Sequence, residues 1–150
     1  MGLARLTAFL HRHRRIALDS NILIYAVEQS PVFGDLAAGV FRWLDAPRNS
    51  AVVSTLTFLE VSVAPYRDNC EELVDSYYGL FKLYPQLDCV PVTIDVADLA
   101  AQLRAEHQLK TPDAIVAATA IRSGATALVT NDPVFDRVAE FETLLLERYA

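Results

Sequence analysis

Apolar residues along this chain follow two spacings that alternate with each other. The first is a short continuous apolar run, which is typical of a strand buried on both faces of a parallel sheet. The clearest runs are IAL at 16–18, AVVS at 51–54 and TALVT at 126–130. Two weaker strands are predicted at 142–146 and at 89–93, where a proline interrupts the run.

The second spacing places apolar residues three and four positions apart, which predicts helices between those runs. Pro65 is expected to end one of them, and the last long helix is expected to have Thr111 as its N-cap, Pro112 at its first position and Gly124 just beyond its end. The predicted helices cover residues 3–10, 22–26, 36–44, 55–64, 71–83, 96–107, 112–123 and 133–138. Strands that alternate with helices indicate an α/β fold, with a mostly parallel central sheet flanked by helices on both faces.

Composition is that of one compact domain. The chain has 150 residues, of which 53% are hydrophobic and 21% charged. No apolar run is long enough to span a bilayer, and the N-terminus does not resemble a signal peptide, because its basic residues follow the apolar ones. We therefore expect a cytoplasmic protein without a membrane partner. Cys70 and Cys89 form no CxxC pair, and we expect both to be reduced and packed.

Charge is unevenly distributed. The net charge is −6, which excludes a generic electrostatic nucleic-acid binder, yet residues 1–15 carry four arginines and no acid. We therefore divide the chain into a basic N-terminal helical arm at 1–15 and an acidic domain at 16–150. The HRHRR run at 11–15 either contacts RNA phosphates or forms a solvated helix end, and both interpretations stay open. Its histidines are poor candidates for metal ligands, because neighbouring arginines would repel a cation.

Four carboxylates interrupt otherwise uncharged sequence. Each of the first three is the only charged residue in its stretch, and the fourth directly follows the uncharged run 123–131. They are Asp19, Glu60, Asp113 and Asp132. Each also has a purely structural interpretation: a helix N-cap for Asp19 and Asp132, a favourable helix-dipole contact for Asp113, and an ion pair with an arginine for Glu60.

The predicted geometry favours a shared site. Asp19 and Asp132 follow the carboxyl ends of parallel strands, the edge at which open α/β sheets bind ligands. Asp113 and Glu60 lie on helix faces with apolar neighbours, the latter beside Val63 and Ala64. Four carboxylates buried together would raise each other's pKa unless a cation neutralised them. Mg²⁺ or Mn²⁺ accepts oxygen ligands and suits phosphoryl transfer, so the pattern predicts a metal-dependent enzyme acting on phosphodiesters.

With these residues identified, the chain resembles PIN-domain ribonucleases, and in size the VapC toxins of prokaryotic toxin–antitoxin pairs. The stretches that carry the resemblance run from about residue 16 to the C-terminus, and in order they are IALDSNILIYA, STLTFLEVSVAP, TPDAIVAATA and LVTNDPVF. The resemblance implies a PIN-like fold and hydrolysis of RNA by a water that attacks the phosphate in line. It also implies a homodimer and an antitoxin protein as partners, which would meet near aromatic residues of the early helices that periodicity alone assigns to the core.

Residue by residue, the resemblance assigns the four acids to catalysis and to Mg²⁺ or Mn²⁺ binding, in the order Asp19, Glu60, Asp113 and Asp132. Asn21 matches a polar residue that supports the first acid, and Thr130 matches a hydroxyl residue that supports the last one by a hydrogen bond. Asp136 is either an accessory acid or an exposed surface residue. The arm before residue 16 is longer than in compact members of the family.

Two other functions compete with the nuclease. A phosphatase of the haloacid-dehalogenase type needs a second aspartate two residues after the nucleophile, where this chain has Asn21, and it needs a lysine that we do not find. A non-catalytic PIN-like module that binds RNA or protein would be expected to have lost some of the four acids. The sequence retains all of them, which favours an enzyme.

Overall fold

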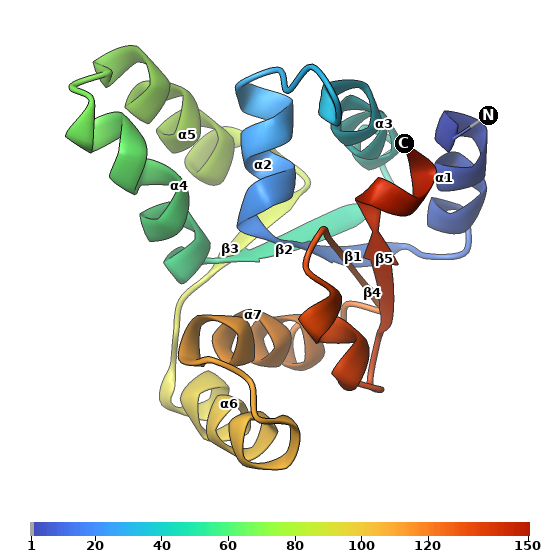
Figure 1. Cartoon of the computed structure of the whole chain (residues 1–150), viewed down its shortest axis with the longest axis vertical. Coiled ribbons are helices and arrows are strands. Elements are labelled where there is room, and N and C mark those ends of the chain that lie inside the picture. Colours follow the sequence, from blue (N-terminus) through green and yellow to red (C-terminus); the bar gives the residue numbers. More distant parts are fainter. Residues whose placement is uncertain (1) are drawn as a thin grey trace.

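A five-stranded parallel sheet forms the centre of the computed structural model, which describes residues 2–150. The strands lie in the order β3-β2-β1-β4-β5, and all four pairings are parallel (Figure 1). Their bounds are β1 (Arg15–Leu18), β2 (Ser50–Ser54), β3 (Leu87–Val90), β4 (Ala127–Thr130) and β5 (Glu142–Leu145). The predicted α/β class and parallel sheet are confirmed.

Helices cover both faces of the sheet, as predicted. In Figure 1, α1 to α5 lie on one side of the strands, while α6, α7 and η1 lie on the other. The bounds are α1 (Gly2–Leu10), α2 (Ser20–Val27), α3 (Gly34–Leu44), α4 (Thr55–Arg67), α5 (Glu71–Leu83), α6 (Ile94–His107), α7 (Thr111–Arg122) and the 3₁₀ turns η1 (Pro133–Arg137) and η2 (Leu146–Tyr149). No helix within residues 2–150 combines the length and apolar character that a membrane span requires.

Two apolar clusters, one on each face, hold the layers together. Along β1, Ile16 and Leu18 belong to the cluster between the sheet and helices α1 to α5, whereas Ala17 belongs to the cluster between the sheet and helices α6 and α7. Side chains of a strand point alternately to opposite faces, so a strand that is apolar at every position can serve both clusters. This is why the strands appear in the sequence as short continuous apolar runs.

Three local predictions were wrong. α4 continues through Pro65 to Arg67, because the proline removes one backbone donor near the end of the helix while its ring is buried. β3 starts at Leu87 and ends before Pro91, which cannot donate to the sheet ladder. α7 begins at Thr111 itself, with Lys110 as its N-cap residue and no side-chain capping bond.

The arm helix α1 is part of the packed core. Leu6 and Leu10 are fully buried against α3, and an added Cβ at Gly39 would come within 2.5 Å of the side chain of Leu3. His13 is also buried, and its Nδ1 lies 2.7 Å from Oγ1 of Thr126. The C-terminal end of the arm is therefore only partly solvated.

The aromatic residues of the early helices pack in the core, as their periodicity indicated. Trp43 is buried, and the other aromatic residues of the early helices are half-buried against the same cluster: Tyr25, Phe33 and Phe41.

Cys70 and Cys89 are both free thiols. Cys70 is exposed, so the expectation that both thiols are packed is wrong for that residue.

Candidate active site at the carboxyl edge of the sheet

Asp19 and Asp132 come together because β1 and β4 pair in parallel. Leu18 is in register with Val129, and the Asp19 N–H extends the ladder by donating to the Val129 carbonyl oxygen at 3.1 Å. Asp19 directly follows β1, and Asp132 lies two residues after the end of β4. The sheet order reverses between β1 and β4, so the two acids lie at the position where open α/β sheets bind ligands.

Each of these two aspartates also caps a helix. One oxygen of Asp19 accepts from the Ser20 N–H at 2.8 Å at the start of α2, and one oxygen of Asp132 accepts from the Val134 N–H at 3.0 Å at the start of η1. Capping and catalysis are thus compatible, because each cap uses one carboxylate oxygen. The second oxygen of Asp132 has no hydrogen-bond partner among residues 2–150.

Thr130 connects the two aspartates. Its hydroxyl donates to the other oxygen of Asp19 at 2.7 Å, and the same Oγ1 accepts from the Asp132 N–H at 3.0 Å. Thr130 is fully buried and Asp19 is only 8% exposed, so water competes little for either bond. The hydroxyl fixes the orientation of the first carboxylate and the backbone of the last.

Glu60 and Asp113 approach the same edge from two helices. α4 begins directly after β2, and α7 packs against β2, β4 and α4, so both helices reach the carboxyl ends of the strands. Glu60 and Asp113 are half-buried. The predicted surroundings of Glu60 are wrong, however, because Val63 and Ala64 are exposed and the face of α4 that carries them points away from the core.

Electrostatic repulsion connects the four carboxylates. Burial raises the pKa of Asp19, and the negative charge of Asp132 raises it further, against hydrogen bonds from Thr130 and Ser20. Burial, then Asp19 and Asp113, raise the pKa of Glu60. Burial, then Asp132 and Asp19, raise the pKa of Asp113, while Lys110 lowers it slightly. The structure therefore brings all four predicted acids within range of one another's charge.

Apart from the effect of Lys110 on Asp113, the cluster lacks a close basic partner among the described residues. In the part of the chain that the structure describes, no lysine or arginine forms an ion pair with any of the four acids. At the start of α2, the side-chain oxygen of Asn21 is buried and has no hydrogen-bond partner within residues 2–150. Buried carboxylates that repel one another are unfavourable, and a bound cation would relieve that repulsion.

The donor chemistry fits a hard divalent cation, although the side chains do not form a ready-made cage. Within residues 2–150, no group of three or more His, Cys, Asp or Glu side chains is arranged so that it could hold a metal ion. Mg²⁺ commonly binds through one or two carboxylates and keeps several waters, so such a cage is not required. Asp19 and Asp132, on adjacent strands, are the best-placed pair.

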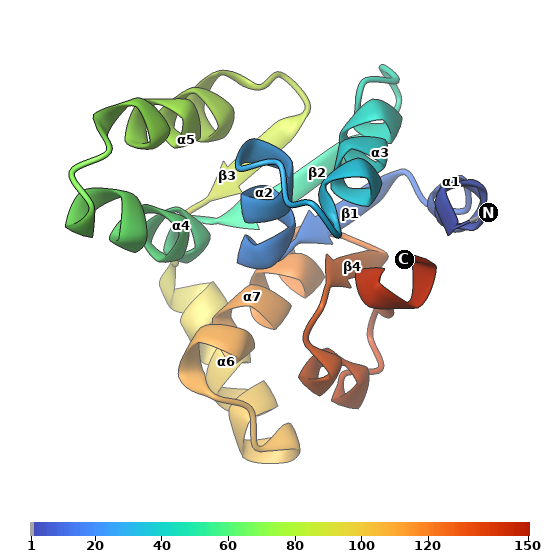
Figure 2. The same ribbon diagram turned by 45° about the horizontal axis from the view of Figure 1, so that its top comes forward.

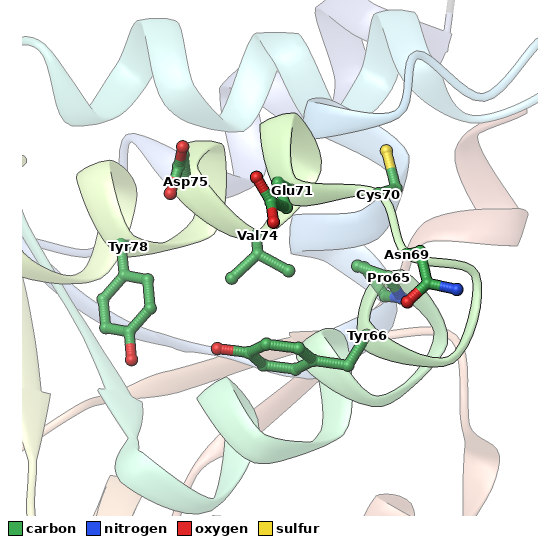
Figure 3. A pocket seen from close by; sticks show the side chains of 8 residues that line it. All are labelled: Pro65, Tyr66, Asn69, Cys70, Glu71, Val74, Asp75 and Tyr78. Carbon is green, nitrogen blue, oxygen red and sulfur yellow. The ribbon is translucent and has the colours of Figure 1, made fainter.

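A separate cavity lies between α4 and α5, away from the four acids. It has a volume of about 280 Å³, and Figure 3 shows the hydroxyl groups of Tyr66 and Tyr78 pointing toward each other across it. Its other lining residues are Pro65, Asn69, Cys70, Glu71, Val74 and Asp75. None of the four carboxylates lines this cavity, so it is separate from the candidate active site.

The sequence of residues 16–141 matches the PIN domain family. The chain belongs to the PIN-domain family. All four acids lie inside the matched range, together with Asn21, Thr130 and Asp136. The helix α1 and the turn η2 lie outside it, at opposite ends of this PIN domain.

Solved structures share the PIN fold at low sequence identity. VapBC2 from Rickettsia felis, bound to a promoter DNA fragment, gives a TM-score of 0.68 at 19% identity over 87% of this chain and 97% of that one. A toxin–antitoxin complex from Klebsiella pneumoniae gives 0.64 at 23% identity over 87% and 97%. VapC20 from Mycobacterium tuberculosis, a Sarcin-Ricin loop cleaving toxin, gives 0.61 at 16% identity over 75% and 86%. No curated protein matches the sequence.

Two further residues of the PIN domain, Asp136 and Asn131, each have polar contacts of their own. Asp136 is exposed on η1, and its carboxylate lies 3.6 Å from the guanidinium of Arg148. Asn131, which sequence reasoning did not single out, donates to the Tyr25 hydroxyl at 3.2 Å and accepts from the Glu147 N–H at 2.7 Å. The sequence signal for this structural role was the position of Asn131, between the end of β4 and Asp132.

Proposed function

We propose that this PIN domain is a divalent-metal-dependent endoribonuclease and the toxin of a toxin–antitoxin pair. The observation that carries the proposal is the cluster of four carboxylates at one sheet edge, which repel one another and have no basic partner among the described residues. Such a cluster is costly for stability unless it binds a cation. The similarity to VapBC complexes supports the toxin assignment.

In this proposal each acid has its own role. Thr130 and the Ser20 N–H hold the Asp19 carboxylate, so that Asp19 and Asp132 present oxygens from two paired strands to Mg²⁺ or Mn²⁺. When bound, the ion supplies positive charge beside the phosphate and lowers the pKa of a water. Asp113 completes the acidic edge. Glu60, whose pKa is raised, takes the proton of the attacking water. Asn21 and Thr130 support the acids that they neighbour.

RNA is the proposed substrate and two proteins are the proposed partners. VapC20, a neighbour in fold, is a toxin that cleaves the Sarcin-Ricin loop, and this supports RNA over DNA. The toxin–antitoxin complexes among the structural neighbours support binding of an antitoxin, and we propose a homodimer on the same ground. Asp136 is proposed as a surface residue that pairs with Arg148.

One observation favours a second candidate function. Because no three carboxylates form a ready-made metal site among residues 2–150, a non-cleaving PIN module that binds RNA or protein is the alternative. That module would bind its ligand without a divalent ion and would not break a phosphodiester bond.

The deciding experiment compares wild type with Asp113→Asn on structured RNA, in Mg²⁺, in Mn²⁺ and in excess EDTA, with the product ends mapped. The matched control is Asp95→Asn, since Asp95 also lies in the first turn of a helix but pairs with Arg122 far from the acidic edge. We expect metal-dependent cleavage by wild type and by the control, and loss of cleavage in a folded Asp113→Asn protein. RNA binding without cleavage under every metal condition would establish the module instead.

A further inference from the structure

The parts of the chain outside the family match lie side by side. α1 and η2 come from opposite ends of the sequence, and both Figure 1 and Figure 2 show the C-terminal turn next to the N-terminal helix. Between them is a shallow hollow of about 420 Å³, within the roughly 300–1,000 Å³ of small-molecule sites. It is lined by Arg5, Ala8, Phe9, Arg12 and Tyr149, and we call it the arm hollow.

The arm hollow combines positive charge with aromatic rings. The guanidinium carbon of Arg5 lies 5.2 Å from the centre of the Tyr149 ring, and that of Arg12 lies 4.7 Å from the centre of the Phe9 ring. Arg5 is exposed and forms no ion pair within residues 2–150. Exposed arginines beside aromatic rings are the combination with which proteins hold unpaired nucleotides, the rings stacking on bases and the arginines contacting phosphates.

This chemistry differs from that of the rest of the molecule. Residues 1–15 carry four arginines and no acid in a protein of net charge −6. The structure also divides the HRHRR run, since His13 is buried against Thr126 and Arg15 pairs with Asp88 at 2.8 Å. Of the arginines in the arm, Arg5 and Arg12 are exposed and line the arm hollow, so they are available to an anionic ligand.

The arm hollow extends between the two edges of the sheet: Arg12 pairs with Glu142 at the start of β5, whereas Tyr149 lies on the carboxyl side. η2 directly follows β5, whose carboxyl end lies at the same sheet edge as Asp132. The Glu147 N–H donates to the side chain of Asn131 at 2.7 Å, which ties the start of η2 to the residue before Asp132. Tyr149 is two residues further on, so its Cα lies within about 7 Å of that of Glu147.

We propose that the arm hollow binds an unpaired nucleotide of an RNA strand whose neighbouring segment lies at the carboxylate edge. The inference rests on the proposed function and adds a second contact, where a base stacks on Tyr149 and Arg5 meets a phosphate. Arg12 joins this contact when RNA displaces its exposed ion pair with Glu142. The acids alone would repel a polyanion, so a basic contact beside them fixes the strand in place. Such a contact positions RNA but reads little of its sequence.

The test measures binding without cleavage, in the Asp113→Asn background. Fluorescence anisotropy with a labelled single-stranded RNA, over a range of salt concentrations, would compare three variants: Arg5→Gln, Tyr149→Leu and Ala8→Leu. The last variant fills the hollow without changing any charge, and Ala8 is exposed on a helix, so folding is not at risk. Arg14→Gln is the matched control, because Arg14 is an exposed arginine of the same arm that does not line the hollow.

We expect Arg5→Gln to weaken binding about three- to tenfold and to make the salt slope less negative by about 0.7, the loss of one phosphate contact on a single strand. Tyr149→Leu should weaken binding roughly fivefold or more by removing a stacking surface. Ala8→Leu should also weaken it, and Arg14→Gln should leave it within about twofold.

Three results would overturn the inference: unchanged binding by all three variants, an equal loss in Arg14→Gln, or equal affinity for a duplex DNA of the same length. Cleavage by the chain with Asp113 intact is measured separately. Cleavage without an effect of the hollow variants rejects only the arm hollow, whereas hollow-dependent binding without cleavage rejects only the nuclease.

Discussion

Acidic residues at the two edges of the sheet differ in whether they form ion pairs. At the amino edge, Arg15 at the start of β1 reaches Asp88 at 2.8 Å and Ser50 at 3.0 Å, and Arg12 pairs with Glu142 at the start of β5 at 2.8 Å. At the carboxyl edge, Asp19, Glu60, Asp113 and Asp132 have no basic partner in an ion pair among the described residues.

The difference separates acids that stabilise the fold from acids that weaken it. The paired carboxylates at the amino edge, Asp88 and Glu142, are more than half exposed, so they keep much of their hydration and gain a modest attraction from their arginines. At the carboxyl edge, burial and mutual repulsion raise the pKa of three of the four acids. A fold that retains such a cluster loses stability at neutral pH, which is the pattern expected of a functional site.

The largest expected effect tests this difference through cleavage. Asp19→Asn removes a carboxylate that Thr130 holds in place, and we expect cleavage to fall by about 10²–10³-fold, as for other groups that stabilise transition-state charge. Asp88→Asn, at the amino edge, should lower cleavage less than about threefold at equal folded fraction. Initial rates on one RNA substrate measure both. Equal losses in the two variants would contradict the functional division of the edges.

The next effect concerns stability at the amino edge. Arg15 is a quarter exposed, and its side chain also donates to the Ser123 carbonyl at 2.6 Å. Arg15→Gln breaks this charged hydrogen-bond set, and we expect the free energy of unfolding to fall by about 1–3 kcal/mol. Urea unfolding measures the change. Cleavage per folded molecule should stay the same, and a selective loss of cleavage would place Arg15 in the site instead.

The third expected effect is a pH-dependent change in thermal stability when an acid of the carboxyl edge is neutralised. The pKa of Asp113 is raised above its ordinary 3.8, so ionisation costs stability as pH rises through the window between 3.8 and the raised value. In metal-free buffer, Asp113→Asn should therefore raise Tm at pH 7 by about 1–4 °C, and the gain should shrink as pH falls toward 3.8. Thermal scans at several pH values would show it. A lower Tm at pH 7 would mean that the charge stabilises the native state.

The smallest expected effect is on the exposed ion pair at the amino edge. The side chains of Arg12 and Glu142 are 58% and 53% exposed, so Glu142→Gln should change the free energy of unfolding by less than about 1 kcal/mol. The same variant frees Arg12 in the arm hollow, and RNA affinity should rise slightly. A large loss of stability would show that the contact with His13, 3.4 Å from Glu142, holds the arm in place.

Sequence patterns predicted the positions of the acids that local structure determines. Asp19 comes one residue and Asp132 two residues after the end of a strand, and the parallel pairing of those strands brings them to the same edge, so both could be placed from the apolar runs. Glu60 was harder, because the apolar residues near it on α4 suggested a buried face. Val63 is 51% exposed, and an exposed apolar residue has the same spacing as a buried one.

Contacts between residues far apart in the chain could not be predicted from the sequence. Neither interpretation of the HRHRR run included the burial of His13, whose ring contacts Thr126, 113 positions away. The hollow between α1 and η2 depends on a contact between opposite ends of the chain, and neither end contains a motif that points to the other. Pairings of this kind depend on the tertiary fold and leave no local periodicity.

The hydrogen bond from Thr130 to Asp19 also bears on when the protein becomes active during its synthesis. The two residues are 111 positions apart, so the first acid is oriented only after β4 has been made and has paired with β1. At about 5–20 residues per second, translation reaches Thr130 only after roughly 7–26 s. Until then the growing chain carries Asp19 and Glu60 without the strand that brings Asp132 beside them. If the protein cleaves RNA as proposed, this order of assembly keeps it inactive toward its own transcript while most of the chain is being translated.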